Sequence, residues 1–458
     1  MRLVLFFIAL LIGPPALAEM RVPRDAADIR TGFVPVVKQA APAVVNIYAR
    51  RVVDVRSPFS DDPFFQDLFR DFGTPRQRVQ NSLGSGVILG AEGIVVSNYH
   101  VVGEATDIRV VLNDRREFSA EVLLSDEESD LAVLKLEDAR GMPALGLRDS
   151  DTVQVGELVL AIGNPFGVGQ TVSSGIVSGL ARSGTATGDA RGYFIQTDAP
   201  INPGNSGGAL VDVNGRLIGI NTAILSRSGG SNGIGFAIPS ALVAQFVTQA
   251  RAGNTEFERP WPGLDGQPVT ADMVEALGLD RPGGVVISQL HPQSPFVEAG
   301  IETGDVITAV DGHPVNTPAE MIFRMSVAGI GTQAGVTRVR QGKRSEVTVA
   351  LVPAPDTPPR ARLTTPRQSA IPGMTLSTVN PGVISEFDLP LSARGAVVED
   401  PGRVGRRAGL RAGDVLTAIN EVPVETSEMA ASLLADARRW LSLEVQRGPR
   451  RLSMRFRL

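Results

Sequence analysis

The sequence predicts a mainly β protein built from several domains. At 458 residues the chain is too long for a single hydrophobic core, so two to four domains are expected. Its 49 glycines, 32 prolines and 5% aromatic content favour many turns and short strands over long helices. From residue 83 to residue 220, short apolar runs recur between Gly, Asp or Pro residues, a spacing typical of β-barrels or sandwiches.

The expected elements follow in order. A short helix over 33–38 precedes a first strand over 43–48. Ser240 is expected to cap a helix from Ala241 to about Ala250, which closes the first domain. Between these ends we expect strands at 84–89, 94–100, 108–112, 118–122, 131–136, 158–162, 175–178, 194–196 and 217–220.

The first residues predict an export signal. Arg2 supplies a positive end, an apolar run extends from Leu3 to Ile12, and Ala16-Leu17-Ala18 provides small residues for cleavage. A membrane anchor would need roughly 20 apolar residues, so no integral membrane segment is expected. We therefore expect a signal peptide over 1–18 and a mature protein outside the cytoplasm; a cytoplasmic peptide-binding protein would require that this segment be retained.

Composition excludes some classes of function. The formal net charge of −5 argues against general nucleic-acid binding, which needs a basic surface. The chain has no cysteine, so disulfides and thiol chemistry are excluded.

The C-terminal half contains an internal repeat. Residues 300–310 match residues 409–419 at an offset of 109 residues, and Pro314-Val315 recurs as Pro423-Val424 at the same offset. Two related modules are therefore expected, over 256–353 and 371–458. The Pro- and Arg-rich segment 354–370 between them is expected to be an extended, mobile linker.

A glycine-rich stretch carries the first candidate for catalysis. Residues 202–208 read Asn-Pro-Gly-Asn-Ser-Gly-Gly, which is either an ordinary turn or a serine nucleophile beside backbone N–H groups that bind an anion. In the second interpretation the N–H groups of Ser206 and Gly204, assisted by Asn205, form the oxyanion hole.

A serine nucleophile needs a base, and the chain has three histidines. His291 and His313 lie in turn sequences and are expected to be solvated, whereas His100 ends the apolar strand that begins at Ile94. Asp130 directly precedes a core strand and is the preferred orienting carboxylate. The chain order His, Asp, Ser is that of chymotrypsin-like double barrels. The competing aspartates are Asp107, Asp114, Asp126 and Asp138, of which Asp126 is expected in a solvated turn.

These motifs carry a family resemblance. The sequences at 97–102, 129–134 and 197–210 resemble those of the HtrA/Deg serine proteases, and so do the stretches 163–167 and 233–239. The two repeats resemble PDZ domains, so the resemblance covers nearly the whole mature chain.

The resemblance implies an ATP-independent periplasmic serine endoprotease that degrades unfolded or damaged proteins and also acts as a chaperone. It implies a chymotrypsin-like protease domain over 19–255 followed by two PDZ domains, with His100 as base, Asp130 as its partner and Ser206 as nucleophile. No metal or other cofactor is implied. Homotrimers and larger cages are expected. The alternative is a catalytically silent PDZ-containing chaperone or scaffold.

The resemblance also implies where substrate binds. The strand 221–225 pairs with the substrate backbone, and Ile224 lines a pocket suited to small aliphatic residues. The implied substrate-binding residues are Ile201, Asn221, Thr222, Ala223, Ile224, Leu225 and Ser226. The Phe-containing segment 57–80 matches a regulatory loop that reaches neighbouring subunits, in preference to local packing, and 179–193 and 226–232 match activation loops.

PDZ domains bind the terminal carboxylate of a peptide in a backbone loop. The matching loop of the first module comprises Pro262, Gly263, Leu264, Asp265 and Gly266, and its Asp265 departs from the usual apolar pattern. In the second module 371–374 matches only weakly, so both a peptide-binding role and a structural role stay open.

Overall fold

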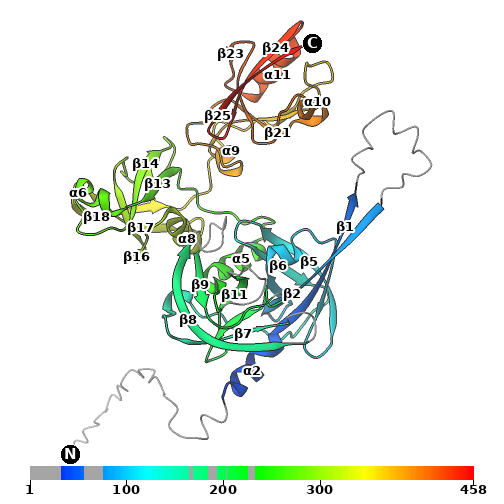
Figure 1. Cartoon of the computed structure of the whole chain (residues 1–458), viewed down its shortest axis with the longest axis vertical. Helices are drawn as coiled ribbons and strands as arrows, with labels where there is room; N and C mark the ends of the chain where they lie inside the picture. The colour runs from blue at the N-terminus through cyan, green and yellow to red at the C-terminus, as the bar shows by residue number, and fades with distance from the viewer. Residues whose placement is uncertain (1–31, 56–75, 165–168, 184–192, 203, 225–232) are drawn as a thin grey trace, which may run out of the picture.

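A computed structural model describes residues 32–55, 76–164, 169–183, 193–202, 204–224 and 233–458. Two β-barrels form the base of the molecule, and two smaller modules follow them (Figure 1). The expectation of a mainly β fold is confirmed. The expected signal segment lies outside the described residues, as do most of the loop 57–80, residues 184–192 of the first expected activation loop and all of the second.

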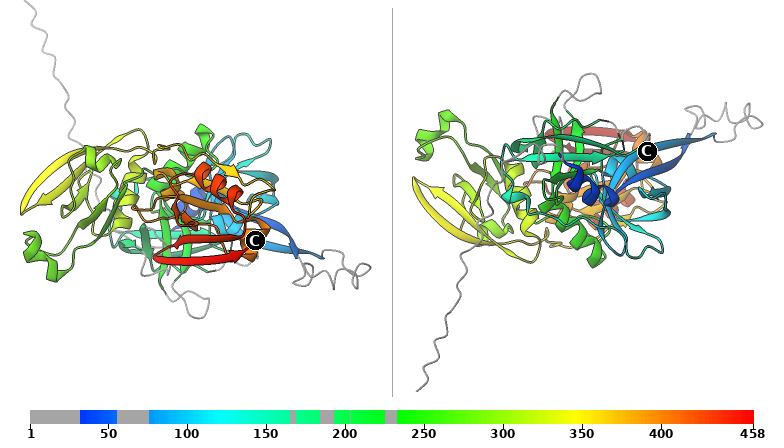
Figure 2. Two further views of the ribbon diagram at one scale, coloured as in Figure 1. Left: turned by 90° about the horizontal axis from the view of Figure 1, so that it is seen from above. Right: turned by 90° about the horizontal axis from the view of Figure 1, so that it is seen from below.

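The first barrel is closed, with strand order β1-β2-β3-β6-β5-β4. Helix α2 (Val34–Ala40) leads into this barrel. The interior of the barrel is filled by buried aliphatic side chains. Strands β1 and β2 pair as far as Val55 and Arg76, and this arm projects from the barrel (Figures 1 and 2). The strands are β1 (Val44–Val55), β2 (Arg76–Gly90), β3 (Ile94–Ser97), β4 (Asp107–Val111), β5 (Glu117–Asp126) and β6 (Leu131–Leu136).

The second barrel is also closed, with order β10-β11-β12-β9-β8-β7. Its strands are β7 (Leu158–Gly163), β8 (Thr171–Ser183), β9 (Tyr193–Thr197), β10 (Ala209–Asp212), β11 (Leu217–Ile224) and β12 (Gly235–Pro239). Helix α5 (Ser240–Ala252) follows, but Ser240 does not cap it. Its hydroxyl instead donates to the carbonyl of Arg148, so this serine ties the helix to the segment that joins the barrels.

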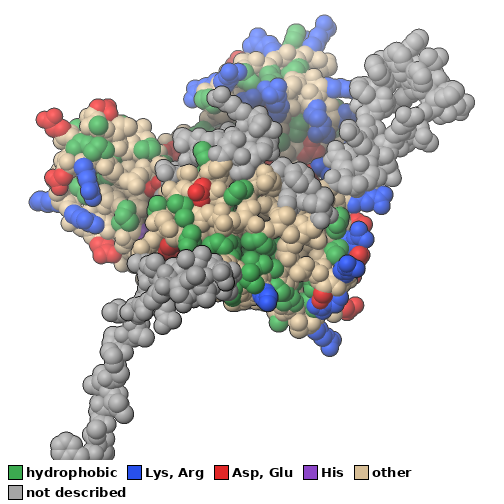
Figure 3. Space-filling view, turned by 60° about the horizontal axis from the view of Figure 1, so that its bottom comes forward, with side chains coloured by type: hydrophobic (Ala, Val, Ile, Leu, Met, Phe, Trp, Pro, Cys, Tyr) green, Lys and Arg blue, Asp and Glu red, His purple; other side chains and the backbone are tan. Residues whose placement is uncertain are grey.

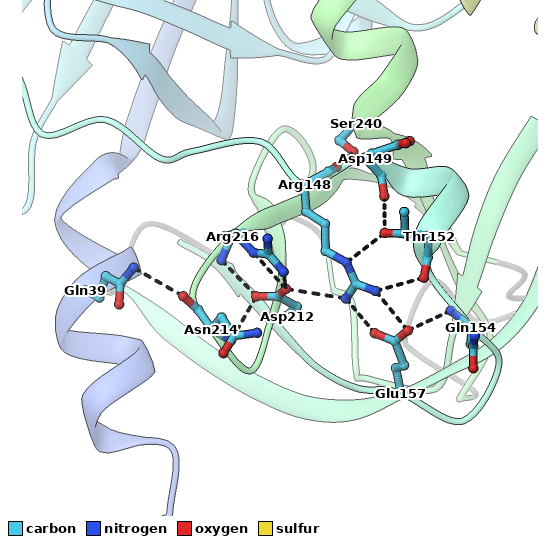
Figure 4. A network of polar contacts seen from close by, with 10 residues as sticks. All are labelled: Gln39, Arg148, Asp149, Thr152, Gln154, Glu157, Asp212, Asn214, Arg216 and Ser240. Carbon is cyan, nitrogen blue, oxygen red and sulfur yellow. Dashed lines mark hydrogen bonds and ion pairs between the residues drawn. The ribbon is translucent and has the colours of Figure 1, made fainter. Parts of the chain in front are cut away.

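That joining segment is held by a polar network (Figure 4). The guanidinium of Arg148 donates to both carboxylate oxygens of Glu157, at 2.6 and 3.0 Å, and lies 3.4 Å from the buried Asp212. The hydrogen bond from Arg148 holds the pKa of Glu157 below its ordinary value. Gln39 of α2 donates to the carbonyl of Asn214 at 3.2 Å, so the network also fixes the N-terminal helix.

The first small module is a sheet in the order β13-β14-β15-β17-β18, with β13 at its edge. Helix α8 (Pro318–Ala328) contacts this edge strand. The other elements are β13 (Leu264–Pro268), α6 (Val274–Leu277), β14 (Val285–Leu290), α7 (Pro295–Glu298), β15 (Val306–Val310), β16 (His313–Pro314), β17 (Gln333–Arg340) and β18 (Lys343–Ala350).

The second module repeats this plan with one strand more, in the order β19-β20-β21-β22-β24-β25. Strand β19 (Leu363–Thr364) belongs to the segment 354–370, which therefore is not the mobile linker expected from its composition. It pairs with β20 (Thr375–Thr378) beside α11 (Ser427–Asp436). The remaining elements are α9 (Pro381–Glu386), α10 (Gly402–Arg407), and strands β21 (Ala396–Asp400), β22 (Val415–Ile419), β23 (Val422–Pro423), β24 (Trp440–Arg447) and β25 (Arg450–Arg457).

No helix in the described part of the chain is long and apolar enough to cross a membrane.

Candidate active site

His100 lies at the surface between the barrels. The chain leaves strand β3 at Ser97, and His100 sits in a single helical turn, α4 (Tyr99–Val102), rather than at the end of the strand as expected. Val101 and Val102 of this turn are buried, which anchors it, while the His100 side chain is 51% exposed. The buried valines thus fix the turn, while the imidazole of His100 is exposed to solvent.

Asp130 binds one ring nitrogen of this histidine and its backbone. Both of its carboxylate oxygens lie 2.9 Å from Nδ1 of His100, and one also accepts the backbone N–H of His100 at 3.0 Å. Its backbone has a left-handed φ of 52°, and its carbonyl accepts from the side chain of Asn98 at 2.8 Å. The structure therefore brings together the histidine and the aspartate selected from the sequence.

Thr222 is a third member of this cluster, and its side-chain contact was not predicted. Its hydroxyl donates to Asp130 at 2.5 Å, from strand β11 of the second barrel. The sequence placed Thr222 in the substrate-binding strand. No local signal indicated that its hydroxyl reaches the first barrel, because this contact depends on how the barrels pack.

Ser206 lies in a turn packed against strand β2. The backbone N–H of Ser85 donates to the carbonyl of Ser206 at 2.9 Å. The hydroxyl of Ser85 donates to the carbonyl of Gly204 at 2.7 Å. A Cβ on Gly207 would lie 2.0 Å from the carbonyl oxygen of Ser85, and φ is +81° there, so glycine is required. The hydroxyl of Ser206 donates to the carbonyl of Thr222 at 3.1 Å, not to His100.

The backbone of Gly204 and Asn205, beside Ser206, belongs to the expected oxyanion hole. Gly204 has a left-handed φ of 99°. The N–H of Asn205 is used within the turn, because it donates to the carbonyl of Asn202 at 2.9 Å. The Asn205 side chain is buried, and the Cβ that Gly163 lacks would lie 2.6 Å from its Oδ1. Asn205 therefore supports the turn, while its backbone N–H faces Asn202.

The expected substrate-binding strand has a free stretch. Strand β10 pairs with β11 as far as Ile220, and both backbone groups of Asn221 bond to Gly207 and Gly208 of the turn. Strand β11 continues to Ile224, with a bulge between Asn221 and Ala223. Ile201 is buried in the core of the second barrel, and the Cβ that Gly235 lacks would lie 2.7 Å from it. Leu225 and Ser226 lie outside the described residues, as do the side chains of Ala223 and Ile224.

Arg259 is a second residue that sequence reasoning missed. It lies in the segment between α5 and the first small module, and its guanidinium donates to both carboxylate oxygens of Asp126, at 3.1 and 2.5 Å. It also donates to the hydroxyl of Ser129 at 2.7 Å. Burial lowers the pKa of Arg259, but the Asp126 carboxylate outweighs this effect and raises it overall.

Asp126 is therefore ion-paired, not in the solvated turn expected. Its carboxylate also accepts the backbone N–H of Ser129 at 2.7 Å. The loop that carries Asp130 is thus tied to the segment that enters the first small module.

The loop expected to bind peptides in the first small module leads into the edge strand β13. Gly263 has a left-handed φ of 58°, and its carbonyl accepts the backbone N–H of His291 at 2.8 Å. His291 is 7% exposed, so the expectation that it is solvated is wrong; it packs edge-on against Trp261. Burial, followed by the charge of Asp388, raises the pKa of Asp265.

Family models match three parts of the chain. A trypsin-like peptidase domain matches residues 84–220, and PDZ domains match residues 261–351 and 396–447.

Curated relatives match over most of their length. The periplasmic pH-dependent serine endoprotease DegQ of Escherichia coli (strain K12) is 37% identical over 438 residues, which cover 94% of this chain and 93% of the relative. The periplasmic serine endoprotease DegP of the same organism is 38% identical over 398 residues, which cover 86% and 80%.

Solved structures show the same likeness. The HtrA-type protease AlgW with a decapeptide is 41% identical at a TM-score of 0.53, covering 70% of this chain and 99% of that one. The same protease with a tripeptide is 38% identical at a TM-score of 0.54, covering 71% and 99%.

Proposed function

This chain belongs to the HtrA family of serine endoproteases, and from that premise we propose that it degrades unfolded or damaged proteins in the periplasm without ATP. The observation that carries the proposal is the cluster at the barrel junction, where Asp130 contacts both His100 and Thr222 beside Ser206. In this proposal His100 is the general base, Asp130 orients it, and Ser206 is the nucleophile.

The reaction begins with a rotation of the Ser206 hydroxyl from the Thr222 carbonyl towards Nε2 of His100. Such hydrogen bonds are often loose in unliganded enzymes and tighten with substrate. His100 removes the serine proton as the serine oxygen attacks the scissile carbonyl, and Asp130 stabilises the resulting imidazolium. The imidazolium then protonates the leaving amine, and a water molecule hydrolyses the acyl-enzyme by the same route.

The oxyanion of the tetrahedral intermediate is bound by the backbone N–H groups of Gly204 and Ser206. The N–H of Asn205 is engaged by Asn202, so Asn205 acts by supporting the turn. Two N–H groups aimed at the developing negative charge are the usual arrangement for acyl transfer, and each contributes about 10²–10³ in rate.

Substrate binds as an added strand. The residues of β11 beyond Asn221 offer backbone groups to an extended peptide, as in other cases of strand addition. The family resemblance assigns Ile224 to the substrate pocket, and an isoleucine offers no charge to a Lys or Arg side chain, so we propose cleavage after small aliphatic residues. Cleavage-site mapping by mass spectrometry on an unfolded protein tests this preference, and cleavage mainly after Lys or Arg would contradict it.

The first PDZ domain receives peptide C-termini at the loop 262–266. Its edge strand β13 and helix α8 offer the site of strand addition. The solved complexes of AlgW with peptides support a peptide-binding role within this family.

An exposed apolar face supports assembly into trimers. Val155, Leu158, Val172 and Ile176 are between 37% and 61% exposed on and beside strands β7 and β8. Leu158 and Ile176 are direct cross-strand partners, and Figure 3 shows hydrophobic side chains gathered on this side of the molecule. Contiguous apolar surface of this kind marks an interface.

The rival function, a catalytically silent chaperone or scaffold, is distinguished by covalent labelling. A fluorophosphonate probe reacts with an activated serine. We expect it to label the native chain at Ser206 and to leave Ser206→Ala and His100→Ala unlabelled. Equal labelling of all three proteins would contradict the triad.

A further inference from the structure

The two PDZ domains differ at one edge of their sheets. In the first domain the sheet ends at β13, next to helix α8. In the second domain the edge of the corresponding strand β20 is covered by β19, and helix α11 contacts both strands. A PDZ ligand occupies this position, because it adds as a strand to the sheet edge beside the helix.

Strand β19 also has the direction and register of a ligand. It runs antiparallel to β20, with Leu363 opposite Leu376 and Thr364 opposite Thr375. Its C-terminal end points to the loop 371–374, the counterpart of the carboxylate-binding loop of the first domain. The backbone N–H of Thr365 donates to the carbonyl of Met374 at 2.8 Å, which extends the pairing to the loop.

Thr365 occupies the place of a terminal carboxylate. Its carbonyl oxygen accepts the N–H of Gly373 at 3.1 Å, and its hydroxyl oxygen accepts the N–H of Met374 at 2.9 Å. Two oxygens of one residue thus bind two successive N–H groups of the loop, as the two oxygens of a carboxylate would. The same hydroxyl donates to the carbonyl of Ile371 at 2.6 Å, which a carboxylate could not do.

Side chains of this segment alternate as in a bound peptide. Thr365 is 3% exposed, and Leu363 packs against the core of the domain, which includes Leu376 and Leu434. Arg362 and Thr364 face outward, and Arg362 reaches Glu399 at 2.5 Å. At the far end, Ser427 of α11 donates to the carbonyl of Ala361 at 2.6 Å, which fastens the segment to the helix.

We propose that residues 360–365 are a built-in ligand of the second PDZ domain. The groove is a peptide-binding site for chain ends with an apolar residue two positions before a C-terminal threonine, and the chain fills it with its own segment. An external peptide of this class binds only when the segment leaves. This proposal does not depend on the protease reaction.

The built-in ligand has a large advantage over a free one. A tethered segment acts at an effective concentration in the millimolar range, and a competing ligand binds with an affinity reduced by the fraction of open grooves. We therefore expect the undisturbed chain to bind an external peptide at least about tenfold more weakly than a chain whose segment is released.

The test uses the full chain with Ser206→Ala, so that no probe is cleaved. The probe is a fluorescent peptide with the sequence Pro-Arg-Ala-Arg-Leu-Thr-Thr and a free carboxylate, which copies residues 359–365. Leu363→Asp places a charge in the apolar groove, whereas Thr364→Asp places the same charge on the outward face of the same strand. We expect Leu363→Asp to bind the probe at least about tenfold more tightly than Thr364→Asp, which behaves like the parent.

Hydrogen exchange locates the binding. The probe is expected to slow amide exchange of residues 373–378 in Leu363→Asp. The same peptide with an amidated C-terminus is expected to bind Leu363→Asp no more tightly than it binds the parent. Equal probe affinity of the two variants, tightening that survives amidation, or no protection of residues 373–378 would each overturn the proposal.

A pair of milder variants tests the proposal if Leu363→Asp unfolds the domain. Thr365→Val keeps the shape of the side chain but removes the hydroxyl that binds Met374, whereas Thr364→Val changes the outward face. We expect Thr365→Val to bind the probe several-fold more tightly than Thr364→Val, at an unchanged melting temperature for the other domains. Equal affinities would contradict the built-in ligand.

Discussion

At the scale of single residues, the candidate active site depends on a contact between the two barrels. Asp130 belongs to the first barrel and is bonded to His100 of the same barrel, but the Thr222 hydroxyl comes from the second. A hydrogen bond to a charged group contributes about 1.5–3 kcal/mol net, which is enough to hold one carboxylate orientation.

This contact gives the first prediction. Thr222→Val is expected to lower kcat about tenfold, because Asp130 loses the donor that fixes its orientation towards His100. KM is expected to change little, and Thr222→Ser, which keeps the hydroxyl, is expected to restore most of the activity. Steady-state kinetics on a peptide substrate measure both. Loss of activity in Thr222→Ser equal to that in Thr222→Val would contradict an orienting role of the hydroxyl.

Arg259 gives the second prediction, since its guanidinium clamps the loop that carries Asp130. Arg259→Ala is expected to lower kcat by about 10- to 100-fold, the cost of a small displacement of a catalytic group. Faster amide exchange of residues 127–130 is expected with it. Arg251→Ala is the control, because Arg251 is an exposed arginine of the same domain that bonds to Glu92. Unchanged exchange in Arg259→Ala would show that the clamp does not hold the loop.

Several of these residues could not be predicted from the sequence. His100, Asp130 and Ser206 were identifiable because each stands in a motif beside an apolar strand. Thr222 and Arg259 act through partners 92 and 133 residues away in the chain, and no local pattern reports such distances. His291 was expected to be solvated because its turn sequence does not reveal that Trp261 covers it.

At the scale of elements, the repeated Gly-Asp motif has a physical explanation. Asp305 and Asp414 are each 1% exposed at the start of equivalent strands, and each is bound by an arginine, Arg340 or Arg447. The same arginines donate to the carbonyls of the repeated glycines, Gly300 and Gly409. The motif therefore marks a buried aspartate that is paired with a partly exposed arginine in each PDZ domain.

This pair predicts a pH dependence of stability. Burial alone would raise the pKa of Asp305, but hydrogen bonds from Arg340 and from the N–H of Glu302 outweigh it and lower the pKa overall. A lowered folded-state pKa stabilises the fold above the unfolded value of about 3.8, and this stabilisation is lost as the pH falls through the folded-state value.

Asp305→Asn is therefore expected to lower the melting temperature of the first PDZ domain by roughly 5–10 °C at pH 7. The difference from the native chain is expected to shrink as the pH falls below about 3.8. Differential scanning calorimetry across this range measures it, with the exposed Asp280→Asn as control. A difference that grows towards low pH would have the wrong sign for this ion pair.

The strands were predictable because turn residues stand at both ends of each short apolar run, and the two closed barrels agree with this pattern. Two short elements were not predictable. The helical turn that carries His100 reads as a continuation of β3, since its residues are apolar and aromatic. Strand β19 lies in a Pro- and Arg-rich segment whose composition resembles a linker, and only its pairing with β20 makes it a strand.

At the scale of the whole molecule, the apolar face on β7 and β8 predicts assembly. Ile176→Asp is expected to convert the proposed trimer to monomer, because it places a charge on the face that includes Leu158. Val422→Asp, a similarly exposed apolar residue of the second PDZ domain, is expected to leave the assembly unchanged. Light scattering after size-exclusion chromatography measures both masses. An Ile176→Asp protein of unchanged mass would place the interface elsewhere.

The most direct test of the proposed mechanism compares casein digestion by the native chain and by Ser206→Ala, with Ser119→Ala, an exposed serine on β5, as control. We expect the native chain and the control to digest casein and Ser206→Ala to lose activity by about 10⁶-fold, the typical cost of removing a serine nucleophile. Digestion by Ser206→Ala at the native rate would contradict the assignment of Ser206, and with it the proposed mechanism.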